Sequence, residues 1–244
     1  LGILSIFAVI FVVPFVEEWP YRLGFTLDHF TSVLQDPNLL SVFTNSLFVA
    51  FCAAVIGVLM SYGAALITAR STLNGKLKSV IEAIALVINT IPGMVLGIAF
   101  LLTFSGTSLQ GTFLILIVCD VVHYFSTPYL MVKNSLSKMN ASWETTAMLM
   151  GDSWIKTILR VVTPNAFSTL LEVFSYYFVN AMVTISAVIF IAGAYTMVIT
   201  TKIKELQYYN RFNEVFVLSL FILAVNVIAK YFFQWLAKRT SRDT

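Results

Sequence analysis

Residues Glu144–Pro164 read ETTAMLMGDSWIKTILRVVTP, a polar, basic, helix-forming segment that lies between two apolar stretches. Apolar side chains recur at helical spacing on both sides of Gly151. Glycine can adopt the left-handed conformation that ends a helix, and Asp152 or Ser153 can cap the helix that follows. We therefore predict two short amphipathic helices joined at this turn, the second of which ends before Pro164.

The rest of the chain is strongly apolar. Of its 244 residues, 59% are hydrophobic and 11% are charged, whereas soluble domains carry about 25% charged residues. The chain is therefore predicted to be an integral membrane protein, and its net charge of +3 gives no reason to expect nucleic-acid binding. Cys52 and Cys119 lie in apolar runs without metal-ligand spacing, so they are interpreted as inert buried thiols.

A helix needs about 20 apolar residues to cross a bilayer, and six runs reach or approach this length. They cover about Leu1–Val16, Leu39–Ala69, Val80–Phe104, Thr112–Val132, Phe167–Ala194 and Val215–Leu236. The predicted fold is therefore all-α and polytopic, with six transmembrane helices in one domain over residues 1–244. Because the sequence opens inside an apolar run without a starting Met, we expect it to be part of a longer chain.

The basic residues indicate the orientation, because short cytoplasmic loops are enriched in Lys and Arg. They collect in the connections around residues 70–78 and 133–160 and in the C-terminal residues 230–242. These regions, and both termini, are predicted to be cytoplasmic. The connection over residues 195–213 also carries basic residues although it falls on the opposite side, so its placement stays open.

The opening segment resembles the cytoplasmic loop of binding-protein-dependent (type I) ABC importer permeases. The family signature is EAA, three residues, Gly, and then a hydrophobic residue and Pro at fixed distances. In this chain the signature positions fall on Thr145, Thr146, Ala147, Gly151, Val161 and Pro164. The signature Glu and first Ala are both replaced by Thr, and Glu144 can supply the charge of the signature Glu from one position earlier.

The resemblance implies that the loop over about residues 134–165 carries a coupling helix, which docks into a groove on an ATP-hydrolysing subunit. An amphipathic helix can lay its apolar face in such a groove. The residues to which it assigns this role are Glu144, Thr145, Thr146, Ala147, Gly151, Asp152 and Pro164. The alternative is an ordinary interfacial helix lying on lipid, which does not need Gly and Pro at these positions.

Other segments resemble the permeases for ferric iron, polyamines, thiamine and phosphonates. These are Phe25–Phe30, Asn45–Leu47, the pair Ala69–Arg70 and the Ile91–Gly97 break. Residues Asn180–Phe190 are similar to the fifth span of members that take up 2-aminoethylphosphonate or iron. Members of this group often fuse two permease halves, and the resemblance is compatible with this chain being a second half.

The resemblance implies a permease subunit of an ATP-driven importer in the bacterial inner membrane, which receives a small solute from an extracytoplasmic binding protein. Ferric iron and 2-aminoethylphosphonate are the favoured solutes. The implied partners are two ATP-binding cassette subunits, a second permease half, the binding protein and membrane lipid. Without a GxxxxGK[ST] loop the chain is expected to bind no cofactor and to be no enzyme, with ATP and Mg on the partner. The alternative is a secondary transporter or channel not driven by ATP, which should show paired broken helices.

Ionisable residues inside the predicted spans are costly, at about 2.5 to 3.5 kcal/mol near the bilayer centre. Asp120 and His123 are three residues apart on one helix face and can form an intramembrane polar pair. The pair would serve either as a structural bond or as a contact for the solute. Glu82 and Glu172 lie near the cytoplasmic ends of their spans, where a solvated carboxylate is the simpler interpretation.

Pro92 and Gly93 predict a kink in the third span, because Pro removes a backbone hydrogen bond and Gly adds backbone freedom. With Asn89 just before it, the kink suits either a wall of the translocation path or close packing between helices. Asn180 and Thr184 on the fifth span either line the path or hydrogen-bond to neighbouring helices. The candidate residues of the translocation path are therefore Asn89, Pro92, Gly93, Asn180 and Thr184.

Overall fold

The structure is a computed structural model that describes the backbone of residues 2–243 and the side chains of residues 7–240. In chain order, the helices are α1 (Gly2–Val12), η1 (Val13–Phe15), α2 (Asp28–Gln35), α3 (Pro37–Arg70), α4 (Gly75–Ile88), α5 (Gly93–Phe104), α6 (Phe113–His123), α7 (Ser126–Lys138), α8 (Ser142–Leu149), α9 (Trp154–Thr157), η2 (Ile158–Val162), α10 (Thr163–Val183), η3 (Val188–Phe190), α11 (Ile199–Tyr208) and α12 (Phe212–Asp243). Two short strands, β1 (Val16–Glu18) and β2 (Arg22–Phe25), form one antiparallel hairpin.

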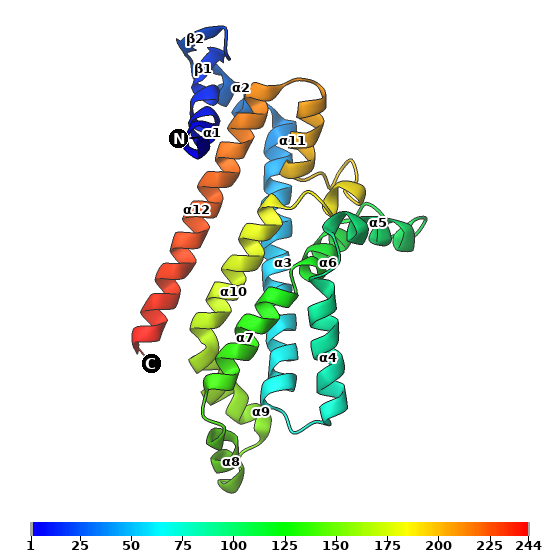
Figure 1. Cartoon of the computed structure of the whole chain (residues 1–244), viewed down its shortest axis with the longest axis vertical. Coiled ribbons are helices and arrows are strands. Elements are labelled where there is room, and N and C mark those ends of the chain that lie inside the picture. The colour runs from blue at the N-terminus through cyan, green and yellow to red at the C-terminus, as the bar shows by residue number, and fades with distance from the viewer. Residues whose placement is uncertain (1, 244) are drawn as a thin grey trace.

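The 34-residue helix α3 is the centre of the bundle, with α10, α7 and α6 packed against it (Figure 1). Small residues let α10 approach α3 closely, as is common between membrane helices. A Cβ added at Gly57 would lie 2.5 Å from the ring of Tyr177. In the same contact, the Ser61 and Tyr177 hydroxyls are hydrogen-bonded at 2.9 Å.

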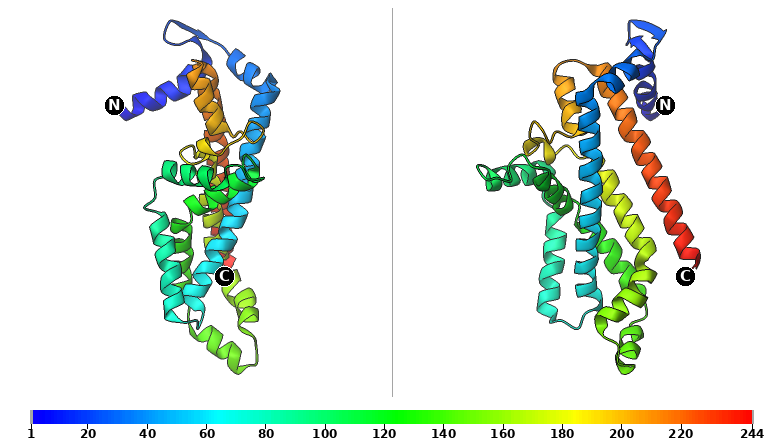
Figure 2. Two further views of the ribbon diagram at one scale, coloured as in Figure 1. Left: turned by 90° about the vertical axis from the view of Figure 1, so that its right-hand side faces the viewer. Right: turned by 180° about the vertical axis from the view of Figure 1, so that it is seen from behind.

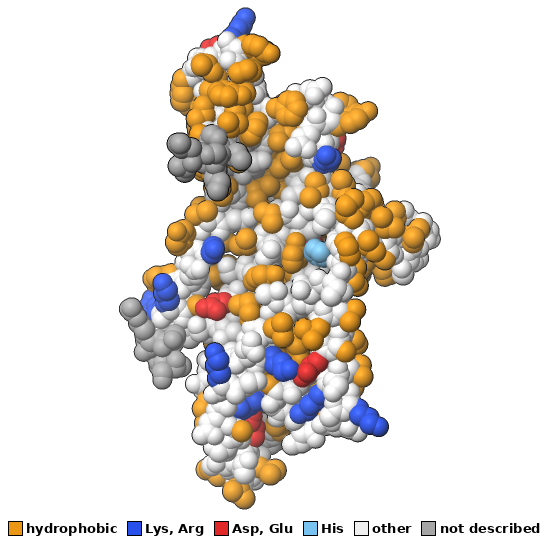
Figure 3. Space-filling model, in the orientation of Figure 1, with side chains coloured by type: hydrophobic (Ala, Val, Ile, Leu, Met, Phe, Trp, Pro, Cys, Tyr) orange, Lys and Arg blue, Asp and Glu red, His pale blue; other side chains and the backbone are white. Residues whose placement is uncertain are grey.

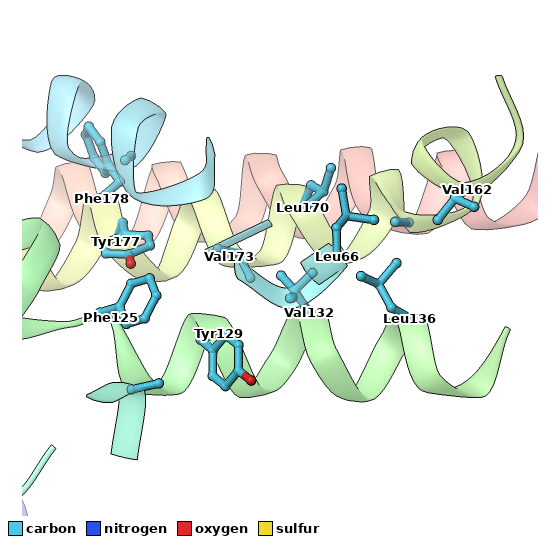
Figure 4. Packing of buried hydrophobic residues seen from close by; sticks show 14 of the residues in the cluster. Leu66, Phe125, Tyr129, Val132, Leu136, Val162, Leu170, Val173, Tyr177 and Phe178 are labelled. Atoms are coloured by element: carbon cyan, nitrogen blue, oxygen red, sulfur yellow. The ribbon is translucent and has the colours of Figure 1, made fainter. Parts of the chain in front are cut away.

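The largest buried cluster fills the space between α3, α7 and α10 towards the end of the bundle that carries α8. Figure 4 shows α7 and α10 running side by side with their side chains turned toward each other. Its labelled members are Leu66, Phe125, Tyr129, Val132, Leu136, Val162, Leu170, Val173, Tyr177 and Phe178. This cluster joins residues more than 100 positions apart in the sequence into one rigid core.

Within the described residues, three helices are long and apolar enough to cross a membrane, or up to five if each of two bent helix pairs is one span. The three are α3, α12 and the continuous helical stretch Trp154–Val183, and they correspond to the predicted second, sixth and fifth spans. The chain is therefore a polytopic helical membrane protein, and the described residues do not confirm the predicted count of six spans.

The first predicted span differs most from its expectation. Helix α1 has 11 residues, which rise about 16 Å, roughly half of the hydrocarbon core. It projects sideways from the end of the bundle that carries the hairpin (Figure 2). The C-terminal end of α12 points toward the end that carries α8, as expected, whereas α1 lies near the opposite end (Figure 1).

Two of the predicted spans are bent. Helices α4 and α5 meet at 108° across residues 89–92. The expected kink is therefore a sharp turn, after which α5 runs crosswise to the long axis of the bundle (Figure 1). Helices α6 and α7 meet at 55°, a break that was not predicted. Its cause is Pro128, whose ring would clash with the carbonyl four residues earlier, at Tyr124 between the two helices, if the helix were continuous.

The fifth predicted span ends earlier than expected. Helix α10 stops at Val183, and residues 184–198 follow an irregular path that includes η3. Backbone packing fixes this path, since a Cβ added at Gly97 of α5 would lie 2.3 Å from the carbonyl oxygen of Ala187. Helix α11 then lies at the hairpin end of the bundle (Figure 1), which places residues 199–208 opposite α8.

Candidate functional site

Helices α8 and α9 form a projection at one end of the molecule, beyond the ends of α3, α4 and α7 (Figures 1 and 2). The hairpin, α2 and α11 lie at the opposite end. On the face shown in Figure 3, Lys and Arg side chains gather in the half of the molecule that carries this projection. The connections that were predicted to be cytoplasmic from their basic residues therefore lie at the same end of the molecule as α8 and α9.

The turn between α8 and α9 has the geometry expected from its sequence. Gly151 has a φ of +81°, in the left-handed region. Its N–H donates to the Met148 carbonyl at 3.1 Å, and the next N–H, of Asp152, donates to the Ala147 carbonyl at 2.9 Å. These two bonds form a Schellman motif. Ser153 then caps α9 by accepting a hydrogen bond from the Lys156 N–H, so the prediction of two helices joined at this glycine is confirmed.

The prediction that the second helix ends before Pro164 is wrong. Helix α9 continues through the π-helical segment η2 into α10, without a break. Pro164 lies in the first turn of α10, directly after the wider π turn, where a missing N–H is tolerated. The carbonyl of Val161 accepts a hydrogen bond from the Asn165 side chain at 2.7 Å. As a result α9 is a direct extension of the membrane helix.

The tip of the projection is apolar and exposed. Met148, Leu149 and Met150, here called the apolar tip, are 71%, 83% and 79% exposed. Helix α8 has no buried residue, and Thr145 and Thr146 are exposed as well. Burying one side chain of this size contributes about 1.5–3 kcal/mol. The apolar tip therefore has the character of a docking surface.

Glu144 has a partner that the sequence did not reveal. Its carboxylate accepts two hydrogen bonds from Arg70, at 2.6 Å from Nε and 2.7 Å from Nη2. This is a bidentate ion pair, with only 4% of the Arg70 side chain and 17% of the Glu144 side chain exposed. The charge that the family signature places at position 145 is thus present, from position 144. Arg70 was used for the orientation and for the family resemblance but was not predicted as a partner of Glu144, because nothing in a single sequence connects positions 74 residues apart.

A cleft of about 450 Å³ lies between α8 and the end of α3. It is lined by Ile67, Arg70, Ser71, Thr72, Leu73, Glu144, Thr145, Met148, Asp152 and Trp154. Asp152 also pairs with Lys156 one helical turn later. The cleft and the apolar tip are contiguous, because Met148 belongs to both.

Two of the candidate path residues, Asn89 and Asn180, line hollows, whereas a third, Thr184, is buried. Asn89 lines a hollow of about 140 Å³ and Asn180 lines one of about 460 Å³. Tyr176 lines both, which brings the two asparagines onto one side of the bundle. By contrast, Thr184 is buried, and its hydroxyl is hydrogen-bonded to the Asn180 carbonyl at 2.6 Å and to the Tyr124 hydroxyl at 2.5 Å.

Pro92 and Gly93 form the sharp α4–α5 turn. A Cβ added at Gly93 would lie 2.3 Å from the Ser186 hydroxyl and 2.9 Å from the His123 ring. The backbone of Gly93 is therefore closely packed against these two side chains in the turn.

The predicted Asp120–His123 pair does not form. Both carboxylate oxygens of Asp120 and Nδ1 of His123 are buried without a hydrogen-bond partner in the described part of the chain. His123 is the last residue of α6, where the helix breaks, and its ring turns toward Gly93 and lies 4.6 Å from the Tyr124 ring. The two residues share one continuous helix, and they do not pair because the His123 ring turns toward Gly93 instead.

Comparison with known proteins gives one family. A family model for the binding-protein-dependent transport system inner membrane component matches residues 57–242. The ferric transport system permease protein FbpB of Actinobacillus pleuropneumoniae is 24% identical over 97% of this chain, which spans 35% of that relative's length. The molybdate/tungstate transport system permease protein WtpB of Pyrococcus furiosus is 23% identical over 88% of this chain and 85% of the relative.

Solved structures show the same fold. A bacterial ABC transporter involved in the import of alginate matches 97% of this chain and 92% of its own, with a TM-score of 0.75 at 16% identity. The MetNI methionine ABC transporter, in inward-facing conformations, matches 86% of this chain and 99% of its own, with a TM-score of 0.61 at 16% identity. At these identities the likeness establishes the fold alone.

Proposed function

The chain belongs to the family of binding-protein-dependent transport system inner membrane components, and from this premise we propose that it is the permease subunit of an ATP-driven importer, coupled to its ATPase through residues 134–165. The observation that carries the coupling role is the apolar tip, which is exposed at the end of a capped helix. An exposed apolar surface on a rigid support suits a helix-in-groove contact with a soluble partner.

In the proposed assembly, two ATP-binding cassette subunits bind ATP and Mg and contact the coupling helices of this chain and of a second permease half. An extracytoplasmic binding protein docks at the end that carries the hairpin and α11. Closure of the ATPase pair pushes the coupling helices and favours the outward-open state, and hydrolysis returns the inward-open one. Because α9 continues into α10, the push enters a membrane helix directly.

Ferric iron is the first solute to test, because the ferric transport relative covers nearly the whole chain. The name of a second relative adds molybdate and tungstate. 2-Aminoethylphosphonate rests only on the resemblance of residues 180–190 and comes after these, with polyamines and thiamine. Uptake of radiolabelled Fe³⁺ by cells that express the whole transporter, with molybdate and 2-aminoethylphosphonate as comparison solutes, tests this order.

The structure contains two bent helix pairs, which is a feature also expected of secondary transporters. The family match covers residues 57–242 and hence both bends, so they are compatible with an importer permease. A catalytically inactive ATPase partner separates the two functions. An ATP-driven importer loses uptake with that partner, whereas a secondary transporter or channel keeps it.

A charged residue in the apolar tip should release the ATPase partner. We expect Leu149→Asp to lower recovery of the co-expressed ATP-binding cassette subunit about 10- to 100-fold, because about 1.5–3 kcal/mol of apolar burial is lost. The measurement is copurification of the chain with the co-expressed ATP-binding cassette subunit. The matched control is Leu23→Asp, since Leu23 is 67% exposed on the hairpin at the opposite end and should leave recovery unchanged. Equal recovery with Leu149→Asp and with the natural chain would contradict the proposed docking surface.

A further inference from the structure

We infer that Arg70 is a positioning residue that fastens the coupling helix α8 to the ends of α3 and α7, so that the three helices move together when α8 is pushed. The inference rests on the proposed function, because it assumes that α8 receives the push. It adds a path for that push through α3, in addition to the covalent path through α9 and α10.

All five N–H donors of Arg70 are used. Besides the two bonds to Glu144, Nη1 donates to the carbonyls of Met139 at 2.9 Å and of Leu136 at 3.4 Å, and Nη2 donates to the carbonyl of Asn140 at 3.0 Å. Only 4% of the side chain is exposed. An arginine that is held at every donor has a single position and orientation.

The three carbonyls give Arg70 a second role, at the end of α7. This helix ends at Lys138, with Met139 as its C-cap, and its last carbonyls have no partner within the helix. A guanidinium in this position satisfies three carbonyls at or just beyond the helix end and interacts favourably with the negative end of the helix dipole. Arg70 therefore binds α7 and α8 through different groups at the same time.

An aromatic contact strengthens the attachment. The Arg70 guanidinium carbon lies 6.0 Å from the centre of the Trp143 ring, within the range of a cation–π contact. Trp143 packs against the buried cluster between α3, α7 and α10. Two consecutive residues at the start of α8, Trp143 and Glu144, thus contact one arginine.

Helix α3 is also fastened at its other end. The Asn45 side chain donates to the carbonyls of Tyr195 at 3.3 Å and Met197 at 3.1 Å. The Ser46 hydroxyl accepts a hydrogen bond from the Ile199 N–H at 2.6 Å. Ser46 and Arg70 are 24 residues apart, which in a helix is about 36 Å. Helix α3 therefore connects the coupling helix with the segment that leads into α11 at the outer end, through polar contacts at both ends.

The first experiment measures the attachment in the purified full chain, without any partner. Spin labels are placed at Thr72→Cys and Thr146→Cys, both exposed, with Cys52 replaced by Ser, and the distance between the labels is measured by pulsed electron paramagnetic resonance. We expect one narrow distance distribution with Arg70 in place, and a distribution at least twice as broad with Arg70→Gln or Glu144→Gln. Arg70→Lys should be intermediate, because lysine cannot make the bidentate contact.

The second experiment measures coupling in the complete transporter. We expect uptake per ATP hydrolysed to fall at least tenfold with Arg70→Gln and with Glu144→Gln, and to fall no further in the double variant than with Arg70→Gln alone, because both changes break the same ion pair. Asn45→Ala should lower the same ratio but leave the label distance between positions 72 and 146 narrow. The control is Lys133→Gln, which breaks the more exposed ion pair between Lys133 and Glu82 and should change neither readout.

The outcomes separate this inference from the proposed function. A narrow distribution with Arg70→Gln, or an unchanged ratio of uptake to hydrolysis, would overturn the role of Arg70. If the natural chain fails to bind an ATPase at all, the proposed function fails, while the label distances still decide whether Arg70 holds α8. If Arg70→Gln does not fold, Glu144→Gln and Arg70→Lys give the same test.

Discussion

Replacing Gly151 by Trp is expected to reduce ATP-dependent uptake to background while the chain remains folded. Gly151 has a φ of +81°, and a side chain in this region costs about 1–2 kcal/mol. That strain opposes the turn that holds the apolar tip in place. The indole would also project from a site where a Cβ meets nothing within 4 Å, so it would protrude into the space that the ATPase partner must occupy.

Two control substitutions separate docking from strain. Gly151→Asn should keep most of the uptake, because Asn tolerates the left-handed conformation and is small. Gly106→Trp places the same side chain on a backbone of similar geometry, with a φ of +73° and open space around its Cβ. Since Gly106 lies in the connection between α5 and α6, away from α8, we expect it to leave copurification of the ATPase unchanged. Uptake that survives Gly151→Trp would show that coupling does not pass through this turn.

Local sequence signals predicted the local features of the coupling site. The turn at Gly151, the cap at Ser153 and the apolar positions around them follow from residue type and spacing, and the structure has all of them. The end of α9 was predicted wrongly because a proline was read as a stop. In the structure a π turn precedes Pro164, and a single sequence gives no signal for that adjustment.

The spans were predictable where one continuous apolar helix suffices, as for α3 and α12. They were not predictable where the chain bends. Pro128 is a usable signal for the α6–α7 break, but the span over about residues 112–132 was predicted from the length of its apolar run alone. The end of α10 at Val183 has no such signal, and the segment after it packs against a residue 90 positions away, where Gly97 approaches the backbone of Ala187.

The charged contacts also include a part that the sequence predicted and a part that depends on how distant segments meet in space. Position 144 was identified as a source of the missing signature charge, and its bidentate bond to Arg70 supports that interpretation. The partner itself depends on how α3 and α8 meet in space. The intramembrane pair of Asp120 and His123 does not form although both residues lie in α6, since helical spacing places two side chains on one face but does not fix their rotamers.

Replacing Gly57 by Leu is expected to destabilise the bundle more than any other single change considered for α3. A Cβ at this position would lie 2.5 to 2.7 Å from three ring atoms of Tyr177. The ring cannot move aside, because Tyr177 is fully buried and its hydroxyl is hydrogen-bonded to Ser61 at 2.9 Å. Helices α3 and α10 would have to separate, at a cost of about 3 kcal/mol or more.

Thermal unfolding of the purified chain in detergent measures this effect. A loss of about 3 kcal/mol corresponds to a fall in Tm of roughly 6–12 °C for a chain of this size. The matched control is Gly63→Leu on the same helix, where a Cβ meets nothing within 4 Å, and we expect its Tm to change by less than about 2 °C.

A second substitution shows whether the clash with Tyr177 is the cause. If it is, combining Gly57→Leu with Tyr177→Ala should cost less than the sum of the two single changes, because the smaller side chain at position 177 makes room for the leucine. Additive losses would mean that Gly57 acts through helix flexibility instead. Close approach of α3 and α10 would then not be what holds the two helices together, and the role of α3 in transmitting motion from Arg70 would lose its structural support.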